Sequence, residues 1–269
     1  STYNNHVSFA SEIKPLFKIA PTDIEAKDIA ELLAFRFNSG QNTGHKYIKK
    51  IKSGHLIRLN YKSNKLKIKK YFDINKTFIT DKKIQYKDAL IITEDALKNS
   101  IKQHLASDVG YSLQLSGGVD SSLICALTAL ESSRKIDSFS IRIDDEKHDE
   151  SKWRKNVVEK YDLNHHELDF NFEDYAESLP IAIKKMEAPI PHSGCPMLMM
   201  LYEKVGKSNK VMLTGEGADE LFGGYHRYKI WKNLQKYGFI ANSMPSFAWR
   251  FLKRYESIKK YVNKDPAIW

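Results

Sequence analysis

The strongest constraint on the fold of this chain is a short loop that stands between a strand pattern and a helix pattern. The segment at residues 111–115 is short and largely apolar, as in a buried strand. Residues 121–130 repeat apolar positions at helical spacing. The loop between them reads Ser116, Gly117, Gly118, Val119, Asp120, Ser121 and Ser122. This order predicts a loop at the carboxyl end of a strand, where open α/β sheets bind ligands.

The composition of this loop indicates an anion site. Gly117 and Gly118 allow backbone N–H groups to approach a phosphate closely, the serines add hydroxyl donors, and the helix start contributes its positive dipole end. Asp120 would repel a bare phosphate, so its presence is explained if it holds a Mg²⁺ that bridges phosphate oxygens. A plain tight turn, with Asp120 capping the helix, is the alternative. The loop lacks the Gly-x-x-x-x-Gly-Lys pattern of a P-loop, which disfavours a kinase or a GTPase.

Strand and helix patterns alternate after residue 110, which predicts an α/β fold with a parallel five-stranded sheet flanked by helices. Strands are expected at residues 111–115, 136–143, 165–170 and 210–214, and helices at 121–130, 150–161, 175–186 and 196–205. A preceding helix at 86–107 has an apolar face that we expect to be buried, formed by Ala89, Ile92, Leu97, Ile101 and Leu105.

The two ends of the chain have simpler patterns. We expect a short strand at residues 6–10, a helix at 24–37, and a β-hairpin whose strands, 56–59 and 66–72, flank residues 62–64. The amino-terminal segment, up to about residue 75, contains no evident catalytic cluster. Residues 229–261 have the spacing of one or two amphipathic helices.

A second loop, residues 213–225, follows the last expected strand and is rich in carboxylates. Glu216, Asp219 and Glu220 lie within five residues and among glycines. Three carboxylates cannot all be buried unpaired, so they need cations or water. If the two loops face each other, Asp219 joins Asp120 as a Mg²⁺ ligand and Glu216 is left to act on a substrate. An exposed acidic turn is the alternative.

Together the two loops resemble the asparagine synthetase family. The motif Ser-Gly-Gly-Val-Asp-Ser-Ser at 116–122 is shared by the wider ATP-pyrophosphatase group, whereas the motif at 215–225, from Gly-Glu-Gly-Ala-Asp-Glu to Gly-Gly-Tyr, separates this family from the others. Further matching segments lie at 138–141, 149–150, 165–167 and 187–189, and residues 9–14 resemble a segment late in the family's glutaminase domain.

The resemblance implies a Rossmann-like ATP-pyrophosphatase domain at residues 79–269, preceded at 1–78 by the partial end of an α+β glutaminase-type domain. It also implies a two-step ligation. ATP activates a carboxylate as an acyl-adenylate and releases pyrophosphate, and ammonia or an amine then displaces AMP to form an amide. The expected cofactors are ATP and Mg²⁺, and the expected partners are a small carboxylate substrate and ammonia or an amine.

Individual site residues follow from the same resemblance. Leu115, Ile141 and Gly215 would line the adenine and ribose pocket. The catalytic residues would be Glu216 and Asp219, with Glu216 either orienting the substrate or accepting a proton from the attacking amine. The metal ligands would be Asp120 and Asp219. The remaining nucleotide-binding residues would be Ser116, Gly117, Gly118, Asp120, Ser121, Ser122 and Thr214.

The sequence also departs from the family pattern. No cysteine precedes Cys125, so we expect no glutaminase activity, and we expect the glutaminase domain or subunit to be absent from this chain. Only 44 residues follow Tyr225, whereas the family's synthetase domain continues further and supplies a catalytic lysine and a substrate-contacting arginine. We therefore expect a fragment that is cut at both ends. Arg142 stands where many members have glycine.

Charge and cysteine content bear on partners and compartment. The net charge is +10, but 35 of the 43 basic residues are scattered lysines, so a nucleic acid partner is not the first expectation. Two cysteines without metal-ligand spacing, no long apolar run and no signal peptide predict a cytoplasmic protein with no membrane association. A homodimer is an arrangement that these features leave open.

Several functions remain open at this stage. The simplest is asparagine synthesis from aspartate, and a close alternative applies the same chemistry to another acceptor, as in lactam-forming or specialised amidotransferases. A tRNA-modifying ATP-pyrophosphatase is a different class, which the second loop argues against. An inactive ATP-binding module is the last.

Overall fold

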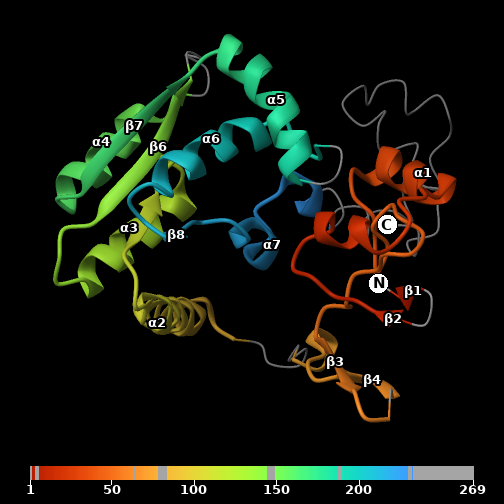
Figure 1. Ribbon diagram of the computed structural model, residues 1–269. Helices are drawn as coiled ribbons and strands as arrows, with labels where there is room; N and C mark the ends of the chain where they lie inside the picture. Colours follow the sequence, from red (N-terminus) through yellow and green to blue (C-terminus); the bar gives the residue numbers. More distant parts are fainter. Residues whose placement is uncertain are drawn as a thin grey trace, which may run out of the picture.

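A four-stranded parallel sheet forms the centre of the structure, a computed structural model that describes residues 2–3, 6–63, 65–77, 84–143, 149–186, 190–229 and 232. The strand order is β7-β6-β5-β8 and all neighbouring strands are parallel. The strands are β5 (Tyr111–Gln114), β6 (Asp137–Ile143), β7 (Asn164–Phe170) and β8 (Val211–Leu213). Because the chain returns through a helix after each strand, the carboxyl ends of all four strands lie at one edge of the sheet (Figure 1).

Helices cover both faces of this sheet. On one face, α3 (Val119–Glu131) and α4 (Ser151–Lys160) pack over a core that includes Leu113, Cys125 and Leu163. On the other, α6 (Cys195–Val205) packs on Phe139 of β6, and α5 (Phe172–Met186) packs on α6. The alternation of side chains along β6 explains this division, since Phe139 and Ile141 contact the α6 side while the alternate residues Ser138 and Ser140 bond to His165 on the other face.

The α/β class is as expected, and each expected strand and helix between residues 111 and 214 is present. The number of strands differs from the expectation, because the described residues contain four parallel strands rather than five. After β8 the chain enters a loop and the short helix α7 (Ala218–Phe222), so no further β segment in the described part extends the sheet edge.

The helix α2 (Tyr86–Leu105) forms where it was expected, but its apolar face is only partly buried. Ile101 is buried, whereas Ile92 is 56% exposed. The reason is that α2 packs mainly on α3, and this contact covers only part of its length. The prediction of a buried face is therefore confirmed at Ile101 and wrong at Ile92.

The amino-terminal part contains a small cluster and a hairpin. Leu16, in the 3₁₀ helix η1 (Lys14–Lys18), packs with Ala20 and Ile48, and α1 (Ala26–Phe35) follows. The remaining elements here are β1 (Thr2–Tyr3), β2 (His6–Val7), β3 (His55–Asn60), β4 (Lys65–Lys70) and η2 (Ile74–Lys76). The antiparallel pair β3 and β4 confirms the expected hairpin, although β2 is shorter than the strand expected at 6–10.

The helices expected between residues 229 and 261 lie outside the described residues, apart from residues 229 and 232. Among the helices that the structure describes, none has the length and apolar character needed to cross a membrane.

Candidate functional site

The two loops that the sequence singled out are in direct contact. A Cβ placed on Gly215 would lie 2.9 Å from the backbone nitrogen of Ser121 and 3.0 Å from the Cβ of Asp120. The second loop therefore packs against the first turn of α3, at a distance that only glycine permits. This contact follows from the sheet order, because β5 and β8 are adjacent parallel strands and their carboxyl ends lie side by side.

Hydrogen bonds within the first loop hold it in one conformation. The hydroxyl groups of Ser116 and Ser121 are 2.9 Å apart, and Ser121 Oγ also donates to the carbonyl of Gly118 at 3.2 Å. The backbone nitrogen of Gly118 donates to Ser116 Oγ at 3.2 Å. The two hydroxyls expected to contact a ligand are therefore already bonded to the loop itself, where they fix its shape.

Gly117 has a conformation and surroundings that exclude other residues. Its φ is +105°, and a Cβ there would lie 2.7 Å from the carbonyl oxygen of Glu150 and 3.1 Å from Cγ of Arg154. The start of α4 thus closes over the loop from the side opposite the second loop. The N–H of Gly117 has no hydrogen-bond acceptor among the residues that the structure describes.

In the second loop, glycines bring the carboxylates close to the backbone. Gly217 precedes α7 with φ +92°, and Gly223 follows it with φ +67°. A Cβ on Gly224 would collide with the carboxylate of Asp219, whose side chain occupies that space. Thr214 Oγ1 accepts a hydrogen bond from the backbone nitrogen of Glu216 at 3.3 Å.

Both loops line one polar cavity of about 200 Å³, which we call the acidic cavity. Carboxylates of Asp120, Glu216, Asp219 and Glu220 all contribute to its wall. Its lining consists of Gln114, Ser116, Gly118, Asp120, Ser121, Thr214, Gly215, Glu216, Gly217, Asp219, Glu220 and Tyr225. Residues about 100 positions apart in the sequence therefore line one cavity, which is the arrangement that the metal-site interpretation required.

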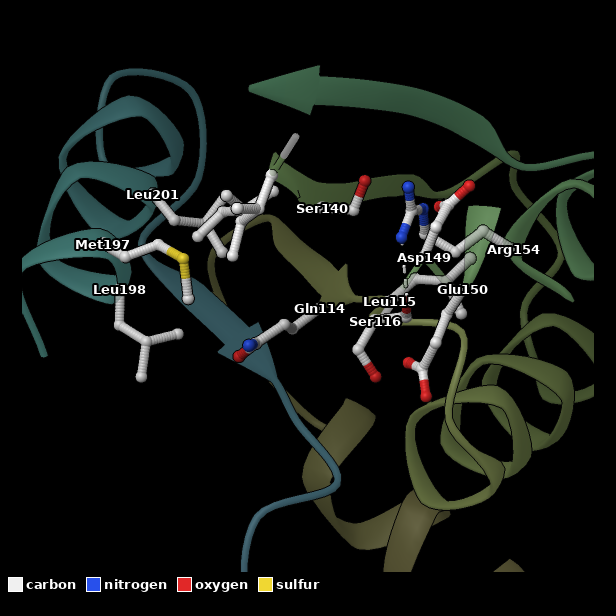
Figure 2. Close-up of a pocket in the computed structure, with 12 residues that line it drawn as sticks. Gln114, Leu115, Ser116, Ser140, Asp149, Glu150, Arg154, Met197, Leu198 and Leu201 are labelled. Atoms are coloured by element: carbon white, nitrogen blue, oxygen red, sulfur yellow. Dashed lines mark hydrogen bonds between the residues drawn. The ribbon is translucent and has the colours of Figure 1, made fainter. Parts of the chain in front are cut away.

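A second cavity of about 320 Å³ adjoins the first across Gln114 and Ser116, and we call it the apolar cavity. Figure 2 shows the side chains around it, with the α6 residues on one side and the start of α4 on the other. Its lining consists of Gln114, Leu115, Ser116, Ser140, Ile141, Ile143, Asp149, Glu150, Arg154, Met197, Leu198 and Leu201. Because the acidic cavity and the apolar cavity share a wall, together they can hold a ligand with a charged end and a flat apolar end.

The structure distributes the expected site residues between these cavities. Leu115 and Ile141 line the apolar cavity, and Ser116 lines both. Gly215 was expected beside them but lies in the acidic cavity, because it packs on the first turn of α3. Gly117 and Ser122 line neither cavity. Gly117 is covered by α4, and Ser122 begins the helical hydrogen bonding of α3 by donating to Gly118.

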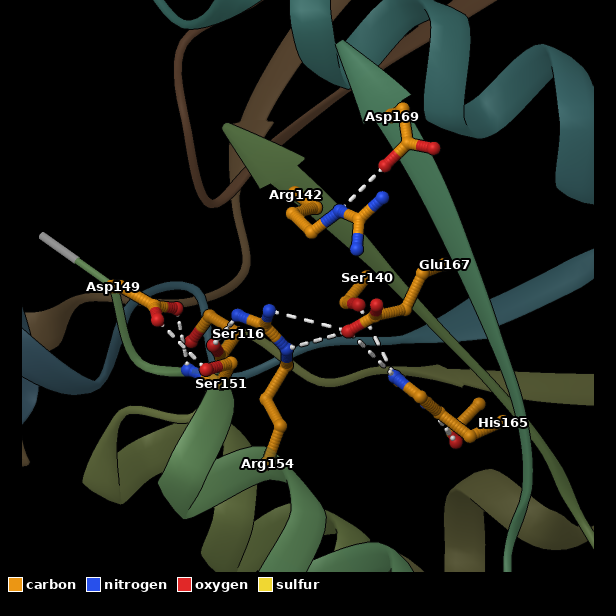
Figure 3. Close-up of polar contacts among 10 residues, drawn as sticks. Ser116, Ser140, Arg142, Asp149, Ser151, Arg154, His165, Glu167 and Asp169 are labelled. Carbon is orange, nitrogen blue, oxygen red and sulfur yellow. Dashed lines mark hydrogen bonds and ion pairs between the residues drawn. The ribbon is translucent and has the colours of Figure 1, made fainter. Parts of the chain in front are cut away.

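Three residues at or beside the site could not be recognised from the sequence pattern, namely Gln114, Tyr202 and Arg154. Gln114 lies at the junction of the cavities, and Tyr202 of α6 donates to its side-chain oxygen at 3.5 Å. Arg154 is 5% exposed, although it stands among charged residues in an amphipathic helix pattern. Figure 3 shows its guanidinium group between Ser116 and Glu167. Only the packing of α4 on the sheet distinguishes it from its solvent-exposed neighbours.

The carboxylates of the acidic cavity affect the pKa values of two tyrosines, Tyr225 and Tyr202. The Tyr225 hydroxyl donates to Glu220 at 2.7 Å, and this bond raises the pKa of Tyr225 to about 12 and lowers the pKa of Glu220 below its ordinary value. Burial, followed by the negative charge of Glu216, raises the pKa of Tyr202. Both phenols therefore remain protonated at neutral pH and act as hydrogen-bond donors.

The donor set of the acidic cavity fits a hard cation such as Mg²⁺. Its carboxylates are oxygen ligands. The Asp219 carboxylate lies against Gly224, in space that a side chain at position 224 would fill. Within the described ranges no three His, Cys, Asp or Glu side chains converge into a preformed metal site. Mg²⁺ commonly takes only one or two carboxylates and completes its shell with water and substrate phosphates, so this donor set suits it.

A comparison with protein families matches residues 93–267 of the chain to the family described as asparagine synthase. Among curated relatives, asparagine synthetase [glutamine-hydrolyzing] 1 of Bacillus subtilis is 29% identical over 248 residues, which cover 91% of this chain and 38% of that protein. Asparagine synthetase B of Escherichia coli is 30% identical over 151 residues, covering 48% of this chain and 26% of that protein. The chain thus spans well under half the length of these relatives.

Among solved structures, the NMN synthetase from Francisella tularensis matches 53% of this chain and 59% of its own chain, at 18% identity and a TM-score of 0.36. A likeness at this level supports no inference about the present chain.

Proposed function

This chain belongs to the asparagine synthase family, and from that premise we propose that it carries the ATP and Mg²⁺ site of an amide-forming ligase. In this proposal residues 79–269 bind ATP, and a carboxylate is adenylated and then converted to an amide. The adenosine occupies the apolar cavity and the phosphates extend into the acidic cavity. The 1–78 segment belongs to the end of a glutaminase-type domain.

The observation that carries the proposal is the contact between Gly215 and the first turn of α3. It joins an anion-binding loop to a cluster of carboxylates in one cavity. A phosphate site or a carboxylate cluster alone would have many explanations. Carboxylates beside a phosphate loop make chemical sense when a divalent cation lies between them.

The first chemical step would proceed at the boundary between the cavities. An oxygen of the substrate carboxylate attacks the α-phosphorus of ATP, the bond from that phosphorus to the bridging oxygen breaks, and pyrophosphate leaves with the negative charge. The N–H groups at the start of α3 would stabilise this charge. Such fixed donors need no reorganisation during the reaction.

The second step would form the amide. Ammonia or an amine attacks the acyl carbon, a proton leaves the nitrogen, and the bond to the AMP oxygen breaks. Glu216, in the wall of the acidic cavity, is placed to take that proton or to orient the substrate. Gln114 lines the same cavity, and its side-chain N–H groups can donate to the reacting groups while Tyr202 donates to its oxygen.

Asp120 and Asp219 would hold the magnesium ion. When bound, the ion would neutralise the phosphate charge and stabilise the departing pyrophosphate. Without it, the same carboxylates would repel the nucleotide, so we expect ATP to bind tightly only with Mg²⁺ present.

Aspartate is the simplest carboxylate substrate, because the family and the curated relatives are described as asparagine synthases and synthetases. Ammonia, or ammonia delivered by a glutaminase domain outside this chain, is the proposed nitrogen source. The alternative within the same chemistry is a different acceptor carboxylate.

The test begins with ATP binding to the 269-residue chain, measured by calorimetry with and without Mg²⁺. Exchange of labelled pyrophosphate into ATP is then measured with aspartate and with a panel of other small carboxylates. Mg²⁺-dependent ATP binding with aspartate-dependent exchange supports the full proposal, and exchange with another carboxylate alone replaces aspartate as the substrate. A chain that binds no ATP in the presence of Mg²⁺ would overturn the proposal.

A further inference from the structure

A buried arginine lies beneath the first loop, residues 116–122, which we call the phosphate loop. It lies on the side opposite the second loop. Arg154, on α4, is 5% exposed, and its Nη1 donates to the carbonyl oxygen of Ser116 at 3.0 Å. The two residues are 38 positions apart in the sequence. Arg154 also lines the apolar cavity, so its guanidinium group adjoins the space proposed for the nucleotide.

Glu167 of β7 fixes the orientation of this guanidinium group. Its Oε1 accepts from Nε of Arg154 at 3.2 Å, and Nη2 of Arg154 lies 3.2 Å from the same oxygen without the alignment of a hydrogen bond. Figure 3 shows the guanidinium group between Glu167 and Ser116. Arg154 thus connects the side chain of a strand residue to the backbone of the loop.

His165 lies next to this pair, with its Nε2 3.7 Å from Oε1 of Glu167. Its ring nitrogens lie 2.8 Å and 3.1 Å from the hydroxyls of Ser138 and Ser140, and burial lowers its pKa. A neutral His165 at pH 7 does not compete with Arg154 for the charge of Glu167.

The hydrogen bond to the Ser116 carbonyl has a geometric consequence for the next amide. In a planar trans peptide the C=O and the following N–H point in opposite directions. When Arg154 holds the Ser116 carbonyl, the N–H of Gly117 is turned away from α4. That N–H has no acceptor among the described residues, and Gly117 itself is buried. An unsatisfied donor in a buried loop is costly unless a ligand accepts from it.

Fold stability alone is a weak reason for this arrangement. Only Arg154 is buried in this pair, since the Glu167 side chain is 36% exposed, and solvent screening leaves such ion pairs little net contribution to stability. A buried arginine that donates a hydrogen bond to a loop carbonyl is better explained by its effect on the conformation of the loop.

We propose that Arg154 is a positioning residue for phosphate binding, because its hydrogen bond to the Ser116 carbonyl fixes the 116–117 peptide, with the Gly117 N–H turned away from α4, and so holds the conformation of the loop that lines the acidic cavity. The inference rests on the proposed function. It deepens that function by assigning a role in recognition of the phosphates to a residue that lines the apolar cavity and not the acidic cavity.

The test compares three ligands with the wild-type chain and its variants: ATP with Mg²⁺, inorganic pyrophosphate with Mg²⁺, and adenosine. The variant Arg154→Met keeps an unbranched apolar stem but removes the donors. We expect it to weaken binding of ATP and of pyrophosphate at least about tenfold while changing adenosine binding less than about twofold. Arg154→Lys keeps one donor and one charge, so it should recover part of the loss.

The matched control is Lys155→Met, on the same helix. Lys155 has a side chain that is 74% exposed and faces Glu159 rather than the loop. Its variant removes one positive charge from α4 and should leave all three affinities within about twofold of wild type. Circular dichroism and thermal unfolding establish that each variant is folded.

If Arg154→Met does not fold, Glu167→Ala gives the decision, since it removes the oxygen that accepts from Arg154 Nε while Arg154 remains. The same selective loss for phosphate ligands supports the inference. An equal loss for adenosine and ATP, or no loss for either, overturns it. A wild-type chain that binds neither ATP nor pyrophosphate would instead remove the proposed function, so the two failures are distinct.

Discussion

Gly215 and Ser121 are separated by 94 positions in the sequence, yet a single Cβ on Gly215 would lie 2.9 Å from the Ser121 backbone nitrogen. The contact joins the loop after β8 to the helix that follows β5. It brings the carboxylates of the second loop to the phosphate loop, and the proposed chemistry depends on that arrangement.

Gly215→Ala should separate the two loops. The added methyl group would lie about 3.0 Å from backbone atoms of Asp120 and Ser121, which cannot move without shifting the start of α3. We expect a loss of about 1 to 3 kcal/mol in the free energy of unfolding, and weaker ATP binding, measured by chemical denaturation and calorimetry. Gly110→Ala is the control, because the neighbour there is the movable side-chain oxygen of Asn209. Wild-type ATP affinity in Gly215→Ala would contradict the role of this contact.

Asp120→Asn and Asp219→Asn should each remove the Mg²⁺ dependence of ATP binding. Both side chains line the acidic cavity, and an amide keeps the shape but loses the charge that holds the ion. We expect ATP affinity in the presence of Mg²⁺ to fall at least about tenfold, which corresponds to about 1.4 kcal/mol, and pyrophosphate exchange to be abolished.

The control for these variants is Asp162→Asn. Asp162 is an exposed carboxylate paired with Lys135, far from the loops in sequence, and its positive φ of 49° is a conformation that Asn tolerates. Near-normal exchange in both cavity variants would remove the metal assignment.

Glu216→Gln distinguishes the two roles open to Glu216. If Glu216 accepts the proton of the amine, pyrophosphate exchange should persist while amide formation slows by about 10²-fold or more. If it orients the carboxylate substrate, both reactions should fall together. The two rates are measured on the same preparation, by labelled pyrophosphate exchange and by amide product with ammonia as nitrogen source.

The two cysteines should differ in reactivity. Burial raises the pKa of the Cys125 thiol to about 12, whereas Cys195 is partly exposed at the start of α6. At pH 8 only roughly one Cys125 in ten thousand would be a thiolate. Alkylation of the native chain should therefore modify Cys195 alone, as detected by mass spectrometry, and denaturant should expose both. Native Cys195→Ser that still takes up the reagent rapidly would contradict the burial of Cys125.

Asp137 should contribute to stability at neutral pH and lose that contribution in acid. Burial alone would raise its pKa, but hydrogen bonds from Asn164, His166 and Asn209 outweigh burial and lower the pKa below its ordinary value. A lowered pKa in the folded state means that the stabilisation is present above the unfolded pKa of about 4. It is lost as the pH falls through the folded value.

Acid unfolding of Asp137→Asn measures this effect. The variant should be less stable than wild type at pH 7 by under about 1 kcal/mol, since the carboxylate is partly exposed and solvent screens it. The difference should shrink below pH 4. Asp95→Asn, on the exposed surface of α2, is the control. A difference that stays constant down to pH 2 would exclude the proposed titration.

The strands and helices around the site were predictable because each depends on local pattern. Residues 111–115 and 121–130 have unambiguous periods, and β5 and α3 form there within about two residues. The extent of burial was less predictable. Ile92 and Ile101 share one apolar pattern on α2, but only Ile101 meets a partner, because burial depends on what packs against the helix.

The sequence by itself determined which residues are candidates for binding phosphate and metal, since Gly117, Asp120 and Asp219 occur in motifs whose chemistry is local. Only the tertiary structure decided how these motifs meet. Adjacent strands β5 and β8 set Gly215 against α3, and the packing of α4 on the sheet sets Arg154 beneath Ser116. The physical reason is that a loop's conformation is specified by its own residues, whereas a contact between loops depends on sheet order and helix packing, which many distant residues specify together.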